Sequence, residues 1–230
     1  MPRNAQKTQK TERERPAIRA FFYISFILVV FLTFVFFYLA ARGAISAVDV
    51  SNYTAVTFSF IFSTAVFAYL LSKGKTLKDI VGSLGLSKNK LTGKIAYVGI
   101  MLFMLLFLLE IIISLITVLT GVQLPTNAQV FESAAPIAIL LFSVFIAPLN
   151  EEILFRGYLV PRYGIFMPAL LFAILHAGYA SITEFTGAFI FGLLAGYVFQ
   201  KTRSLYPSVI AHILVNGVAV AAFLLASSQL

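Results

Sequence analysis

The 230-residue chain contains no cysteine and little charge. Without cysteine there is no disulfide, no thiolate metal site and no cysteine nucleophile, so any catalysis must use oxygen and nitrogen side chains. Charged residues make up only 11% of the sequence and hydrophobic residues 60%, whereas roughly a quarter of an average soluble domain is charged. This composition, with a mean hydropathy of +0.95, excludes a soluble globular fold.

Long apolar runs take the place of the missing charge. They repeatedly reach the roughly 20 residues that a helix needs to cross a bilayer. The sequence therefore predicts an all-α polytopic transmembrane helical bundle, a multi-pass protein of the cell membrane with about seven spans. The seven runs are 20–41, 50–72, 95–131, 133–150, 163–183, 185–200 and 204–230.

Positive charge lies in the connections between these runs. Every basic residue except Arg42 falls in alternate connections: the first 19 residues, the loop 73–94, and the two later connections that hold Arg156 with Arg162 and Lys201 with Arg203. By the positive-inside rule, this pattern predicts a cytoplasmic N-terminus and a C-terminus on the outside. The net charge of +8 is thus interpreted as a sign of topology and of contact with anionic membrane lipid, with no nucleic-acid partner.

The same pattern predicts three parts of the chain. Residues 1–19 are polar and mixed in charge, which indicates a flexible basic cytoplasmic tail. Residues 20–120 hold three membrane spans, with a cytoplasmic loop at 73–94 that has room for a short interfacial helix. Residues 133–230 hold four helices, and most of the ionisable side chains at membrane depth lie there.

A cluster of charge stands at the end of the fourth span. Glu152 and Arg156 have the i,i+4 spacing of a helical ion pair, whereas Glu151 is turned about 100° away and has no local partner. Such a carboxylate can act as a general base or acid, or can bind a metal. A charged helix end at the cytoplasmic interface would explain the cluster equally well.

The last span carries a polar stripe. Ser208, His212 and Asn216 are spaced four apart, so they share one face of an otherwise apolar helix, and that face is expected to look into the protein. The fourth helix is expected to continue to about Val160, before a turn at residues 161–164. Helix geometry then puts Glu151, His176 and His212 roughly 8 to 18 Å from the cytoplasmic ends of their helices, at a common depth.

Three short motifs follow one another in this part of the chain. Glu151-Glu-Ile-Leu-Phe-Arg156 fits EExxxR, Phe172-Ala-Ile-Leu-His176 fits FxxxH, and His212-Ile-Leu-Val-Asn216 fits HxxxN. Together they resemble the CPBP (Abi) family of intramembrane proteases, which includes the type II CAAX prenyl proteases. The resemblance covers residues 134–222.

The resemblance implies an intramembrane endopeptidase that hydrolyses a peptide bond near the cytoplasmic membrane face. Its implied substrate is a membrane-associated peptide or a prenylated protein. A base for water and donors for the developing negative charge are what peptide hydrolysis needs. The implied catalytic residues are Glu151 as general base, His176 as its helper in activating water, His212 and Asn216 as oxyanion donors, and Glu152 with Arg156 as the pair that orients the site.

The family is commonly described as metalloproteases, and Glu151, His176 and His212 could supply three ligands to zinc. The chain lacks H-E-x-x-H, however, and the same residues also suit a metal-free site driven by a glutamate. No cofactor is therefore established from the sequence, and zinc stays open.

Two other functions fit parts of the pattern. Glu110 lies in the middle of an apolar run outside all three motifs, so with Glu151 and the histidines it could form the relay of a proton-coupled membrane transporter. Transporters usually show internal repeats, and the sequence shows none. The other alternative is a catalytically idle bacteriocin-immunity adaptor, which the intact Glu151, His176 and His212 argue against.

Two further features predict packing. Gly192 and Gly196 form a GxxxG pattern in the sixth span, which indicates close contact between helices. The 24 phenylalanines are interpreted mostly as lipid-facing or core residues without a binding role.

Overall fold

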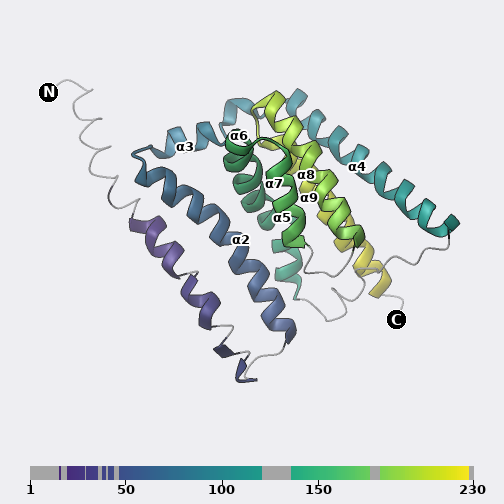
Figure 1. Ribbon diagram of the computed structural model, residues 1–230, viewed down its shortest axis with the longest axis horizontal. Coiled ribbons are helices and arrows are strands. Elements are labelled where there is room, and N and C mark those ends of the chain that lie inside the picture. Colours follow the sequence, from purple (N-terminus) through teal and green to yellow (C-terminus); the bar gives the residue numbers. More distant parts are fainter. Residues whose placement is uncertain are drawn as a thin grey trace. The chain divides into compact units, whose positions relative to one another are not determined.

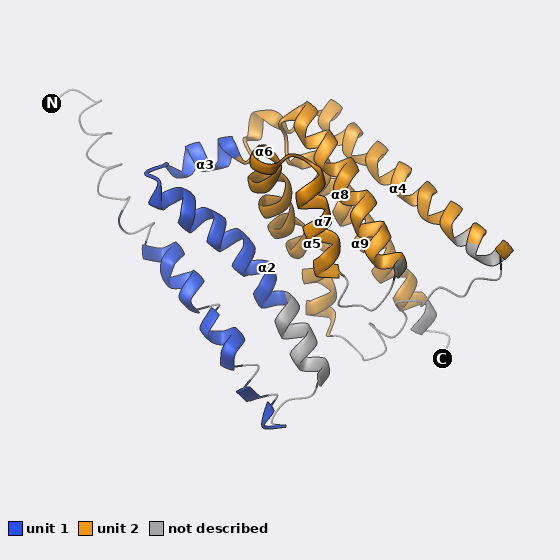
Figure 2. Ribbon diagram, viewed as in Figure 1, with its two compact units in different colours: residues 1–83 blue, residues 84–230 orange. Residues whose placement is uncertain are grey.

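The computed structural model of the chain describes mainly its helices. Described are residue 16 and residues 20–28, 30–35, 38–39, 41–43, 47–120, 136–176 and 182–227. This part of the chain is helical and holds no strand, which confirms the all-α prediction (Figure 1). The chain divides into two compact units, residues 1–83 and 84–230 (Figure 2). Apart from residue 16, the predicted tail lies outside the described residues.

The first unit contains α2 (Ala47–Ser72) and the short α3 (Leu77–Ser83). A capping box starts α3: the backbone N–H of Asp79 donates to Thr76 Oγ1 at 3.2 Å, and the backbone N–H of Thr76 donates to the Asp79 carboxylate at 3.0 Å. Hydrogen bonds from Thr76 lower the pKa of Asp79. The loop predicted at 73–94 thus holds a short helix.

The second unit is a helical bundle in which α9 packs against both α4 and α5, and α7 packs against α8. A 3-10 turn, η1 (Lys88–Lys90), precedes the bundle. Between α5 and α6 the helix continues as a π-helical segment, η3. The helical elements are α4 (Gly93–Thr120), α5 (Ile137–Glu152), η3 (Ile153–Leu159), α6 (Val160–Tyr163), α7 (Phe166–His176), α8 (Ile182–Thr202) and α9 (Tyr206–Ser227).

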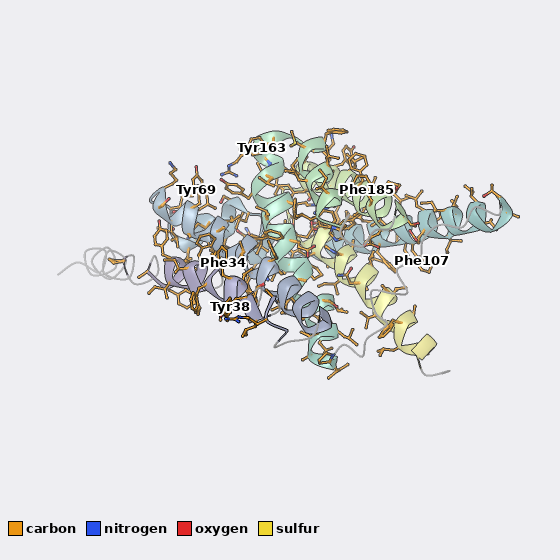
Figure 3. The ribbon with its side chains drawn as sticks, turned by 60° about the horizontal axis from the view of Figure 1, so that its bottom comes forward. Phe34, Tyr38, Tyr69, Phe107, Tyr163 and Phe185 are labelled. Atoms are coloured by element: carbon orange, nitrogen blue, oxygen red, sulfur yellow. The ribbon has the colours of Figure 1, made fainter. Side chains whose placement is uncertain are left out.

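The surface of this bundle suits a lipid environment. Among the described residues, three stretches are long and apolar enough to cross a membrane: Gly93–Ile113, Ile137–Tyr163 and Tyr206–Leu225. Large apolar side chains are exposed along them, among them Phe107 and Tyr163, which Figure 3 labels. Apolar exposure on this scale marks a membrane or partner surface. The prediction of a helical membrane bundle is confirmed, while the count of seven spans and the cytoplasmic N-terminus stay predictions.

The fourth span ends later than the sequence predicts. The helix was expected to stop near Val160, but it continues through Pro161 to Tyr163 and turns at Gly164, whose φ is +75°. Pro161 is tolerated because it lies in the first turn of α6, where a backbone N–H is not needed. Just before it, the N–H of Val160 bonds to the carbonyl of Phe155, five residues back.

The predicted close packing at the GxxxG pattern is confirmed. A Cβ on Gly192 would lie 2.8 Å from the Cα and Cβ of Ala169, and one on Gly196 would lie 2.9 Å from Ile165 Cγ2. Small residues at these positions let the backbones of α7 and α8 approach. Because α7 also carries Phe172, this contact helps to set the position of the Phe172 ring relative to α8.

Candidate active site

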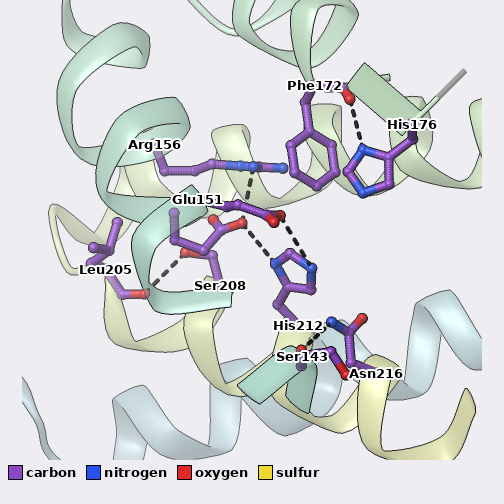
Figure 4. Close-up of polar contacts among 10 residues, drawn as sticks. Ser143, Glu151, Arg156, Phe172, His176, Leu205, Ser208, His212 and Asn216 are labelled. Atoms are coloured by element: carbon purple, nitrogen blue, oxygen red, sulfur yellow. Dashed lines mark hydrogen bonds and ion pairs between the residues drawn. The ribbon is translucent and has the colours of Figure 1, made fainter. Parts of the chain in front are cut away.

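The end of α5 and the middle of α9 bring the candidate residues together (Figure 4). Glu151 and Glu152 lie in the last turn of α5, Arg156 follows in η3, and His212 reaches them from α9. Glu152 and His212 are 60 positions apart in the sequence and meet because α5 packs against α9. The π-helical segment begins directly after Glu152, and such interruptions of α-helices are frequent at functional sites.

Glu152 is the centre of a buried polar cluster. Its Oε1 lies 2.9 Å from Arg156 Nη1 and 3.2 Å from His212 Nδ1. Glu152 and Arg156 are buried, and their contact confirms the ion pair predicted from i,i+4 spacing. Because an ionised carboxylate only accepts hydrogen bonds, Nδ1 of His212 is the donor. Glu152 therefore fixes the orientation of the imidazole.

Glu151 faces the other nitrogen of the same imidazole. Its Oε2 lies 3.8 Å from His212 Nε2, and its side chain is 20% exposed, whereas that of Glu152 is 0% exposed. Sequence spacing left Glu151 without a local partner, and α9 supplies one. A separation of 3.8 Å is too long for a direct hydrogen bond, but one water molecule can lie within reach of both atoms.

Two aromatic rings enclose the guanidinium of Arg156. Its Cζ lies 4.5 Å from the ring centroid of Phe172 and 4.8 Å from that of Phe191, which are cation–π distances. The same two rings contact His212, with centroids 5.8 and 4.8 Å apart. Phe172 belongs to the FxxxH motif. Phe191 belongs to no motif, and nothing in the sequence distinguishes it from the other phenylalanines.

His176 joins the cluster through Phe172. Its Nδ1 donates to the backbone carbonyl of Phe172 at 2.8 Å, and its ring centroid lies 4.4 Å from the Phe172 ring. Since Nδ1 is the donor, Nε2 is the acceptor nitrogen of the neutral ring. The ring of Phe172 thus contacts both histidines. Figure 4 shows it beside His176.

The polar stripe of α9 faces inward, as predicted. Ser208 and His212 are buried and Asn216 is half-buried. The amide nitrogen of Asn216 donates to the backbone carbonyl of Ser143 on α5 at 2.8 Å. An amide nitrogen carries two hydrogens, so this contact holds the side chain and leaves a second donor. The hydroxyl of Ser208 donates to the carbonyl of Leu205, three residues back in the chain, at 3.0 Å.

The two histidines that could bind zinc each have Nδ1 engaged in a hydrogen bond. Among the residues described, no group of three or more His, Asp, Glu or Cys side chains has the geometry to hold a metal ion. In the zinc set implied by the resemblance, Nδ1 of His212 bonds to Glu152 and Nδ1 of His176 bonds to a backbone carbonyl. Hydrogen bonding through Nδ1 is usual for a histidine that binds a metal through Nε2, so these contacts do not argue against zinc, and its binding stays a prediction.

Glu110 lies on a different surface of the bundle. It is exposed on α4, between the exposed side chains of Leu108 and Ile111. Glu151 and the histidines belong instead to α5, α7 and α9. The described residues thus give no support to a relay that would join Glu110 to them.

Comparison with known proteins identifies a family that part of the chain resembles. Residues 133–218 match the family model described as Rce1-like, type II CAAX prenyl endopeptidase Rce1-like. Neither the search of the curated proteins nor that of the solved structures found a significant match. The matched segment contains all three motifs and the whole cluster around Glu152.

Proposed function

We propose that this chain is an intramembrane endopeptidase that cuts near the cytoplasmic membrane face, because residues 133–218 match the Rce1-like family model. One observation carries the proposal: the imidazole of His212 is held by Glu152 at Nδ1 and faces Glu151 with Nε2. The proposed substrates are membrane-associated peptides or prenylated proteins, as the description of the family suggests.

Glu151 is the proposed general base. A water molecule about 2.8 Å from both Glu151 Oε2 and His212 Nε2 would fit the gap between them. Glu151 would take a proton from this water while the water oxygen attacks the carbonyl carbon of the peptide. Glu151 suits this role because it is the partly exposed carboxylate of the two, whereas Glu152 is buried and contacts Arg156 and His212.

His212 and Asn216 are the proposed donors to the oxyanion. Attack places negative charge on the carbonyl oxygen, and preorganised donors stabilise that charge strongly in apolar surroundings. His212 would enter the step as imidazolium, with Nδ1–H bound to Glu152, and would donate its Nε2–H to this oxygen while keeping both protons. Asn216 would add the amide hydrogen that Ser143 does not use. Glu151 would then return the proton to the leaving amine.

The first experiment looks for cleavage products. Purified full-length protein in phospholipid vesicles is given a farnesylated peptide with a CAAX end, and the same peptide without the lipid, and fragments are identified by mass spectrometry. We expect fragments from the wild type and a loss of about 100- to 10,000-fold in rate for His212→Gln. Absence of fragments from both peptides with the folded wild type would contradict the proposal.

A further inference from the structure

We propose that Phe191 is a positioning residue of this site: its ring holds the imidazole of His212 and the guanidinium of Arg156 in place around Glu152. The inference rests on the proposed function and extends it to α8. The other side chains of the cluster come from α5, η3, α7 and α9.

Phe191 contacts both partners of the central carboxylate. Its ring centroid lies 4.8 Å from that of His212, with the ring planes inclined by 58°, and also 4.8 Å from Arg156 Cζ. The ring of Phe172 is 5.8 Å away and completes the enclosure from α7. Phe191 is itself buried, so the surrounding helices restrict its ring.

Arg156 depends on this enclosure because its polar contacts are few. Its Nη2 and the Oε2 of Glu152 are buried without a hydrogen-bond partner among the residues described. A planar guanidinium held mainly through one carboxylate oxygen can turn about that contact, and the two adjacent aromatic rings resist this turning. Removal of the Phe191 ring would take away one of these two contacts.

Two contacts are needed to hold the imidazole of His212 so that its Nε2 faces Glu151. Glu152 fixes the Nδ1 end of the imidazole, and the plane of the ring then decides whether Nε2 faces Glu151. Phe191 contacts the imidazole in a tilted arrangement that restricts its rotation. It therefore acts through His212 and Arg156, and it contacts neither the water nor the peptide in the proposed reaction.

The direct test reads the tautomer of His212. The chain has only two histidines, His176 and His212, so nitrogen-15 NMR of histidine-labelled protein in detergent micelles shows two imidazoles, which a His176→Gln variant assigns. At alkaline pH, where the imidazole is neutral, we expect its one ring proton on Nδ1 of His212 in the wild type. Phe191→Leu should give the signals of both His212 tautomers. Phe191→Tyr keeps the aromatic ring and should give the wild-type spectrum.

Phe189→Leu is the matched control. Phe189 lies on the same helix, and its ring pairs with Phe166 at 5.7 Å. This variant also loses an aromatic contact of α8, but it should leave the His212 signals unchanged. An unchanged His212 tautomer in Phe191→Leu, or the same change in Phe189→Leu, would overturn the inference.

Kinetics gives a second readout. Phe191→Leu should lower kcat by about 10- to 100-fold and leave KM within about twofold, because a misplaced catalytic group slows the reaction without weakening substrate binding. In a double variant with Arg156→Lys, the fall in kcat should be smaller than the product of the two single falls, because Phe191 and Arg156 both act on the cluster around Glu152. A change in KM alone would contradict the inference. If the wild type cuts no peptide, the proposed function fails, while the NMR result still decides the role of Phe191.

Discussion

Glu151 and Glu152 are adjacent in sequence, but the fold gives them different surroundings. Successive side chains on a helix point about 100° apart, so only one of two neighbours can face the centre of the bundle. Glu152 does so and binds Arg156 and His212, whereas Glu151 keeps some exposure and faces the far nitrogen of the same imidazole. A buried and a partly exposed carboxylate can therefore have different roles in one site.

The two carboxylates should therefore respond differently to removal of their charge. Glu152→Gln leaves Arg156 buried without its ion pair, which should lower the free energy of unfolding by about 3 to 5 kcal/mol. Glu151→Gln should change it by less than about 1 kcal/mol. Thermal unfolding of the two variants in the same detergent measures the difference. Equal losses of stability would contradict the assignment of Glu152 as the central structural carboxylate.

Asn216 and Ser208 share the inward face of α9 but differ in what they offer a substrate. Asn216→Ala removes a proposed oxyanion donor and should lower kcat by about 100- to 1,000-fold. Ser208→Ala removes a hydroxyl that bonds to the nearby Leu205 carbonyl, and should change kcat by less than about threefold. Steady-state kinetics of the two variants checks the ranking, and the reverse order would remove Asn216 from the proposed mechanism.

Local spacing made some of this site predictable. The Glu152–Arg156 pair and the inward stripe of α9 follow from i,i+4 positions on one helix, which the sequence shows directly. The contact between Glu152 and His212 was not predicted, because the common depth related Glu151, and not Glu152, to the histidines. Phe191 could not be identified, because no local pattern tells which of the phenylalanines on α8 lies against α9.

At the scale of elements, proline was a poor guide to where the fourth helix ends. Pro161 suggested a turn, but its place in the first turn of α6 lets the helix continue to Tyr163. Nor did the sequence predict the π-helical segment after Glu152. Hydrophobic periodicity does not distinguish π from α backbone over seven residues, and the difference appears only in the hydrogen bonds.

The contact between α7 and α8 gives a test at this scale. Gly192→Ala puts a Cβ 2.8 Å from the Ala169 backbone, so the helices must move apart at a cost of about 1 to 3 kcal/mol. Cleavage should also fall, because α7 carries Phe172 and His176.

Gly187→Ala on the same helix is the control, since nothing lies within 4 Å of its added Cβ. It should be neutral or stabilise the protein by up to about 1 kcal/mol, as alanine favours a helix over glycine. Unfolding experiments in detergent compare the two variants. Equal stability of Gly192→Ala and Gly187→Ala would mean that this close packing does not constrain the fold.

At the scale of the whole molecule, composition alone indicated a helical membrane protein, and the structure confirms it. Scarce charge and long apolar runs leave few other folds, because a bilayer requires the backbone to satisfy its own hydrogen bonds. The number of spans is harder to predict. Besides the three long stretches, the apolar helices Val56–Ser72 and Phe166–His176 are shorter than a typical span.

The absence of cysteine makes the predicted topology directly testable. Single cysteines introduced into otherwise unchanged protein need no background correction. We expect Lys88→Cys and Lys201→Cys to react with a membrane-impermeant maleimide only from the cytoplasmic side, and Asn127→Cys and Ser181→Cys only from the outside. Labelling of all four from one side would contradict the alternating topology.

The central claim is that Glu151 activates water for peptide hydrolysis, and one comparison of rates tests it most directly. In single-turnover cleavage by the full-length protein in vesicles, Glu151→Gln should be slower than wild type by about 100- to 10,000-fold. Glu110→Gln removes an equally unusual carboxylate from the exposed face of α4 and should keep the wild-type rate within about threefold. A Glu151→Gln variant that still cuts at the wild-type rate would contradict the claim.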